Sequence, residues 1–148
     1  MKRLVVCIFT ILCILQSVNS QENKQKFSPA KFQAELEAFI TKEACLTTNE
    51  ANAFFPLFRE MGKKQRGVYQ KMRKLGFEKP KTEEECKNVI IQRDRMDMEL
   101  KKIQQTYHNK FLEILPACKV FDVIKAEDRF HRRVLKKWSH NSNPTKKH

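Results

Sequence analysis

The segment from Arg59 to Lys81 carries the densest charge in the sequence. It holds nine basic residues against two acidic ones, Glu60 and Glu78. Methionine, valine and tyrosine are interleaved with these cations, and flexible thioethers beside basic groups suit a surface that adapts to many partners. A solvated helix face would carry the same charges, and the methionines could pack in a core instead. The binding interpretation gives one candidate surface: Arg59, Lys63, Lys64, Arg66, Tyr69, Arg73 and Lys74.

Catalytic chemistry has no signature in this chain. The sequence lacks a glycine-rich phosphate loop and the HExxH, CxxC and GxSxG patterns. The four histidines, at positions 108, 131, 140 and 148, lie in different segments, whereas metal ligands usually cluster. We therefore expect a protein that is not an enzyme, with no cofactor and no metal site.

The first twenty residues have the three parts of a secretory signal. Lys2 and Arg3 are followed by an apolar run from Leu4 to Leu15 and then by a short polar stretch. The apolar run is shorter than the roughly 20 residues that span a bilayer. We expect cleavage after Ser20 and an exported, soluble mature chain.

Export changes both the charge and the cysteine count of the folded protein. Removal of Lys2 and Arg3 leaves 28 basic against 17 acidic residues, a formal charge of +11. Such a balance favours an acidic partner, either a polypeptide or a membrane surface, and export argues against nucleic acid. Three cysteines, at positions 45, 86 and 118, remain in an oxidising compartment. At most one internal disulfide can form, and the odd thiol is free, buried or bonded to a second chain.

Helix is the only regular structure that the patterning supports. The mature chain has three glycines and no long alternation of apolar and polar residues. We expect one helical domain over residues 21–138, after the signal peptide at 1–20 and before a disordered polar tail at 139–148. Helices are expected from Ser28 to about Ala44, from Thr47 to Leu75, from Thr82 to Leu115 and from Ala117 to Trp138. Capping boxes mark the second and third starts, Thr47 with Glu50 and Thr82 with Glu85.

Apolar residues on the two long helices recur at spacings of three and four. The second helix shows them from Phe54 to Leu75 and the third from Cys86 to Ile114, which is typical of helices that pack lengthwise on each other. The expected fold is all-α: a long antiparallel helical hairpin with flanking shorter helices. The last helix is expected to bury Val120, Phe121, Ile124, Val134, Leu135 and Trp138. Its basic residues and Trp138 also leave open a weak contact with a membrane surface.

Two segments resemble the LTxxQ motifs of the Spy/CpxP family of periplasmic helical proteins. They are Leu46–Glu50, with Glu50 where the family has Gln, and Asn109–Phe121, with Pro116 in place of the motif's Thr. The resemblance covers about Phe32 to Trp138. It implies a periplasmic protein whose hairpin dimerises into a basic, partly apolar cradle. It also implies an ATP-independent chaperone in the stress response, which binds unfolded or stressed envelope proteins and other unfolded or acidic polypeptides.

The resemblance also implies how the cysteines pair. The two motifs lie at one end of the family's hairpin, which predicts a Cys45–Cys118 disulfide and leaves Cys86 unpaired or shared between chains. Family members with another role supply the alternative function, a periplasmic stress or metal sensor or an adaptor that docks on a membrane signalling protein.

Overall fold

The computed structural model describes residues 28–77 and 79–141, and this part of the chain is helical with no strand. It contains α2 (Pro29–Glu43), α3 (Thr48–Leu75), α4 (Glu83–Ile114) and α5 (Ala117–Asn141). The predicted all-α class is confirmed. α5 runs three residues past Trp138, the end that we expected. The predicted signal peptide and residues 142–148 lie outside the described residues.

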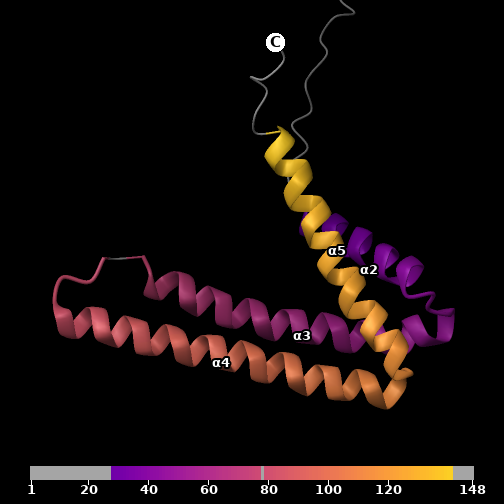
Figure 1. Cartoon of the computed structure of the whole chain (residues 1–148), viewed down its shortest axis with the longest axis horizontal. Coiled ribbons are helices and arrows are strands. Elements are labelled where there is room, and N and C mark those ends of the chain that lie inside the picture. The colour runs from indigo at the N-terminus through magenta and orange to yellow at the C-terminus, as the bar shows by residue number, and fades with distance from the viewer. Residues whose placement is uncertain (1–27, 78, 142–148) are drawn as a thin grey trace, which may run out of the picture.

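The four helices form two pairs that meet at one end (Figure 1). α3 and α4 lie side by side and run in opposite directions, connected by the turn near Gly76–Thr82. α2 packs on α5, and this second pair rises from the other end of α3 and α4 on the side of α3. We call the meeting point the corner; it contains the two connections Ala44–Thr47 and Leu115–Pro116.

Side chains at the helix starts supply the hydrogen bonds that the first turns lack. The Thr47 hydroxyl accepts a bond from the Glu50 amide, and the Glu50 carboxylate accepts one from the Thr47 amide at 2.8 Å. Thr82 and Glu85 form the same reciprocal pair at the start of α4. Both predicted capping boxes are confirmed. Ser28 caps α2, with Pro29 in the first turn.

α2 ends in a tight turn that sends the chain into α3. The Leu46 amide bonds to the Thr41 carbonyl at 3.0 Å and the Cys45 amide to the Lys42 carbonyl at 3.4 Å, which is a Schellman motif. Its left-handed position is occupied by Cys45, with φ of 47°. Glycine is usual at this position because it has no Cβ to clash, so Cys45 holds a strained backbone conformation.

The core lies at the corner, where all four helices contribute to it. Its largest fully buried side chains are Phe54 from α3, Tyr107 and Phe111 from α4, Ile40 from α2 and Val123 from α5. Aromatic rings make up much of this cluster; the Phe54 and Phe111 centroids are 4.7 Å apart. Farther along α3 and α4, Val68 and Leu100 are the buried residues within the described ranges. The corner therefore fixes the angle between the two pairs.

The structure corrects the predicted buried face of α5. Phe121, Leu135 and Trp138 are exposed, while Val123, Ala126 and Phe130 are buried beside Val120. α5 packs mainly on α2 and makes a smaller contact with α4, so one narrow stripe is covered. On α4, Phe111 is buried and the predicted Ile114 is 38% exposed, because the helix ends there and the chain turns away.

No helix within residues 28–77 and 79–141 combines the length and the apolar character needed to cross a bilayer.

Candidate binding groove

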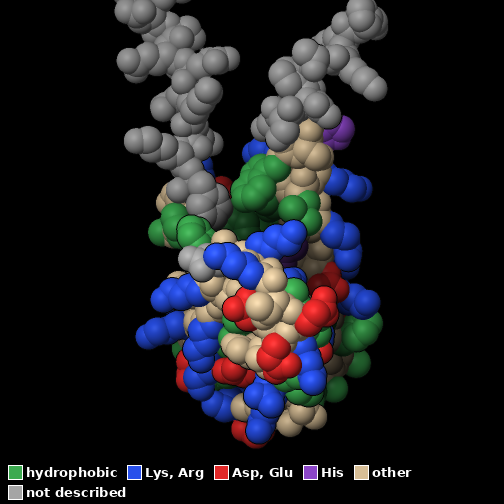
Figure 2. All heavy atoms as spheres, turned by 90° about the vertical axis from the view of Figure 1, so that its left-hand side faces the viewer, with side chains coloured by type: hydrophobic (Ala, Val, Ile, Leu, Met, Phe, Trp, Pro, Cys, Tyr) green, Lys and Arg blue, Asp and Glu red, His purple; other side chains and the backbone are tan. Residues whose placement is uncertain are grey.

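The structure divides the predicted basic surface among different faces of α3. Arg59, Arg66 and Arg73 are seven residues apart, close to two helical turns, so they follow one face. Arg59, Arg66 and Tyr69 line a hollow on the side of the α2 and α5 pair. Figure 2, which looks onto the free end of α3 and α4, shows Lys and Arg along the flanks and acidic side chains nearer the middle.

The lysines of that predicted surface lie elsewhere. Lys64 forms an ion pair with Glu60 at 3.4 Å, and its Nζ lies 5.3 Å from the ring centroid of Tyr107 on α4. Lys63 and Lys74 are exposed and do not line the hollow. One helix therefore separates the seven predicted residues into a face toward the hollow and faces turned away from it.

The hollow fills the inner angle between α3 and the α2 and α5 pair, and we call it the inner hollow. Its volume is about 330 Å³. Buried Leu36, Phe58 and Met61 contribute to its walls. Its other lining residues are Phe32, Gln33, Arg59, Gly62, Gln65, Arg66, Tyr69, Glu127 and His131.

A shallow groove continues from the inner hollow along α3 and α4. Gln65 and Tyr69 line both, so the two form one surface. The groove adds α4 residues, among them Met98, which is 65% exposed, Lys101 and His108. Its lining mixes apolar and basic side chains with amides and the carboxylate of Asp97, and this long, open surface suits an extended peptide better than a small molecule. We call the combined surface the binding groove.

Ion pairs fix part of the rim of the inner hollow. Arg59 Nη1 donates to both carboxylate oxygens of Glu37, at 2.9 and 3.0 Å, and this links α3 to α2. Gln33 donates to the same carboxylate at 2.9 Å. The charge of Arg59 is therefore balanced by Glu37, and Arg59 is less available to a ligand than its exposure suggests.

Two histidines face Glu127 from different helices. His131 Nε2 lies 3.8 Å from the Glu127 carboxylate, and this neighbouring carboxylate raises the pKa of His131. On α4, partial burial lowers the pKa of His108, and the charge of Glu127 opposes this shift. The described residues contain no group of three or more His, Cys, Asp or Glu placed to hold a metal ion.

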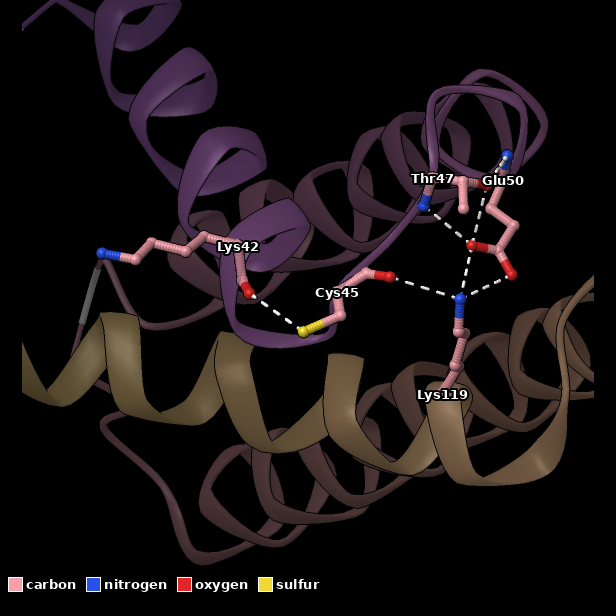
Figure 3. A network of polar contacts seen from close by, with 5 residues as sticks. All are labelled: Lys42, Cys45, Thr47, Glu50 and Lys119. Carbon is pink, nitrogen blue, oxygen red and sulfur yellow. Dashed lines mark hydrogen bonds and ion pairs between the residues drawn. The ribbon is translucent and has the colours of Figure 1, made fainter.

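A polar network at the corner joins α3 to α5 (Figure 3). Lys119 Nζ donates to the Glu50 carboxylate at 2.6 and 2.7 Å and to the carbonyl oxygen of Cys45 at 3.2 Å. Glu50 thus serves the capping box and the ion pair together. These bonds lower the pKa of Glu50 to about 2, with the Lys119 hydrogen bond as the largest cause. The network therefore links the two helix pairs at the corner.

The predicted Cys45–Cys118 disulfide is not formed in this structure, where Cys45, Cys86 and Cys118 are all free thiols. The two segments do meet, since Lys119 contacts the carbonyl of Cys45. Adjacent residues on a helix point about 100° apart. Lys119 contacts the backbone of Cys45, and the neighbouring Cys118 is exposed. Pairing stays a prediction for the oxidised protein.

Sequence reasoning missed the α2 and α5 contributions to the binding groove. The sequence does not indicate that Phe32, Glu127 or His131 lines a site with α3. Their spacing of four residues places Glu127 and His131 on one helix face, but nothing local indicates that α3 lies opposite. Only the angle at the corner brings these residues to Arg66.

Comparison with known proteins gives no relative: no protein-family model, no curated protein and no solved structure matches the chain.

Proposed function

We propose that this protein is a chaperone-like binding protein that holds unfolded or partly unfolded polypeptides in the binding groove without catalysis and without a nucleotide cycle. The observation that carries the proposal is the continuity of the groove through Gln65 and Tyr69. It gives an extended segment a path with both apolar walls and basic rims. Because the walls are formed by side chains that also pack the corner, the site is preorganised.

Electrostatics would bring clients in, and apolar contacts would hold them. A formal charge of +13 over the whole chain attracts acidic segments over a distance of about one Debye length, roughly 10 Å at 0.1 M salt. Tyr69 and Met98, 52% and 65% exposed, offer adaptable apolar contact without a deep pocket. Binding of this type is weak, reversible and tolerant of sequence, as a holding chaperone requires. Added salt should weaken it.

The resemblance to the Spy/CpxP family supports the same proposal and extends it. It adds a periplasmic location and a homodimer whose two copies form a cradle. The mixture of basic and apolar groups in the binding groove agrees with the face that such a cradle presents. If the chaperone test fails, the sensor or adaptor role of other family members becomes the favoured function.

Light scattering of an aggregating, chemically reduced model client tests the proposal. The protein is added at a near-equal molar ratio without ATP, and suppression of aggregation is expected. Reversal of Arg66 and Lys101 together to Glu should weaken it, because both side chains line the binding groove. Arg59 is left intact because its ion pair links α3 to α2.

A matched control separates location from total charge. Lys71 and Lys87 are exposed and line neither part of the binding groove, and their reversal to Glu changes the net charge equally. This variant should retain suppression. Equal loss in both variants would refute the groove as the binding site. No suppression by the unaltered protein would refute the chaperone proposal and favour the adaptor role.

A further inference from the structure

The inner hollow differs from the rest of the binding groove in shape and in charge. It is bordered by three helices and open on one side, and Leu36, Phe58 and Met61 in its walls are at most 5% exposed. Phe32 forms an edge, held by Phe130 at a ring-centroid distance of 5.3 Å. The volume of about 330 Å³ lies at the small end of the range of ligand sites, which begins near 300 Å³. It matches a single side chain with its neighbour better than a cofactor.

The cationic groups on the rim of this hollow are not equivalent. Arg59 is neutralised by Glu37 at 2.9 Å. Across the hollow, Glu127 faces His131 at 3.8 Å. Arg66 has no ion pair within the described part of the chain, and it is the rim charge without an acidic partner there. A guanidinium in this position is suited to a carboxylate, which it can bind through two parallel hydrogen bonds.

Gly62 sets where the Arg66 guanidinium lies. A Cβ at position 62 would stand 3.2 Å from Arg66 Nη1, so the side chain crosses α3 directly over this glycine. Both residues line the hollow. Gly67, on the same helix, has open space where its Cβ would be. The absence of a side chain at 62 therefore lets the guanidinium lie at the edge of an apolar cavity.

We propose that the inner hollow is a specificity subsite that takes one aromatic or long aliphatic side chain of a client and binds the carboxylate of the adjoining residue to Arg66. This inference rests on the proposed function, since it names what part of a client enters the enclosed end of the groove. The carboxylate comes either from an Asp or Glu next to the apolar residue or from the free carboxyl end of a chain. Such a subsite would give a tolerant groove a preference among clients.

Direct peptide binding tests the subsite independently of aggregation. Short fluorescent Gly/Ser peptides with blocked ends carry Phe-Glu, Ala-Glu or Phe-Gln at their centre, and anisotropy measures their Kd for the mature chain. Phe-Glu should bind about tenfold tighter than either partner peptide, the size of one charge-assisted hydrogen bond or one buried side chain. A fourth and a fifth peptide, ending in Phe with a free or an amidated carboxyl, distinguish the two sources of the carboxylate.

Two variant pairs assign the effect to named residues. Arg66→Gln should make Phe-Glu and Phe-Gln equal while the preference for Phe over Ala remains. Gly62→Leu should abolish both preferences, because its side chain displaces Arg66 and enters the hollow, whereas Gly67→Leu should leave them intact. Leucine favours helix over glycine, so both glycine variants should melt no lower than the unaltered protein, and a loss of binding confined to Gly62→Leu is not a folding defect.

The outcomes separate this inference from the proposed function. Selective peptide binding without suppression of aggregation supports the subsite and refutes the chaperone role. Equal affinity for all the peptides, or equal effects of the two leucine variants, overturns the subsite even where aggregation is suppressed.

Discussion

Glu50 and Lys119 lie 69 positions apart in the sequence and form a 2.6 Å ion pair that ties the first turn of α3 to the first turn of α5. Around this contact the chain changes direction twice, and both helix pairs diverge from it. The orientation of the inner hollow depends on that divergence.

The Glu50 ion pair should make stability depend on acid pH. Its pKa lies at about 2 in the folded state, against an ordinary value of 4.5. A lowered folded-state pKa stabilises the fold above pH 4.5, and this stabilisation is lost as the pH falls toward 2. Glu50→Gln keeps a capping side chain but removes the charge. The difference in Tm between the unaltered protein and this variant should therefore shrink between about pH 5 and pH 2; a difference that stays constant would contradict the assignment.

Truncation to alanine should affect stability differently at two phenylalanines that the sequence does not distinguish. Phe111 is 1% exposed in the corner core, and Phe121 is 59% exposed on α5. Phe111→Ala should cost about 3–5 kcal/mol of unfolding free energy because it leaves a cavity. Phe121→Ala should change it by no more than about 0.5 kcal/mol. Urea denaturation, monitored by circular dichroism, measures the unfolding free energy of both variants. Similar losses would show that the face of α5 assigned to the core is wrong.

Replacement of Cys45 should stabilise the protein if the new residue tolerates a left-handed backbone. Cys45→Gly should add about 1 kcal/mol because it relieves the clash of Cβ at a φ of 47°. Cys45→Ala keeps the Cβ and should give no such gain, and it controls for loss of the thiol. Thermal denaturation under reducing conditions compares the three proteins. A gain with alanine equal to that with glycine would show that strain is not the cause.

The two histidines that face Glu127 should titrate in opposite directions from 6.5. The neighbouring Glu127 carboxylate raises the pKa of His131, and burial lowers that of His108. Protonation of His131 thus stabilises the fold below pH 6.5, and this contribution is lost as the pH rises through its folded-state pKa. NMR titration of the imidazole protons measures both groups. Glu127→Gln should lower both pKa values, with the larger change at His131, and no change at His131 would exclude the pairing.

The helices of this protein are largely encoded by local signals, and the sequence analysis located them for that reason. Thr47 with Glu50 and Thr82 with Glu85 satisfy amides only at a helix start, so they mark the two long helices within a residue. The burial of Phe54, Met61 and Val68 follows the three-and-four spacing on α3. Capping boxes and apolar spacing can be recognised without knowledge of the rest of the fold.

Features that depend on the angle at the corner could not be predicted. Phe121 and Val123 are both apolar residues of α5, and which one is buried depends on where α2 crosses the helix. The helical periodicity of α3 predicts that Arg66 lies near Tyr69. The opposite wall of the inner hollow contains His131 and belongs to α5, which starts 51 residues after Arg66. The ion pair of Arg59 with Glu37 was also beyond a local interpretation, so the predicted surface included a residue whose charge is neutralised.

Because the core lies at the corner, α3 and α4 are held together more strongly at that end than near the turn that connects them. Beyond Val68 and Leu100 the two helices hold each other through half-buried side chains such as Met72 and Met96. Amides near the Gly76–Thr82 turn should therefore exchange with solvent through openings that leave the corner closed. The binding groove lies on the corner side of this loosely held part, because its outermost lining residues, Tyr69 and Asp97, are close in sequence to buried Val68 and Leu100. A polypeptide held there, as we propose, would stay bound while the turn opens and closes.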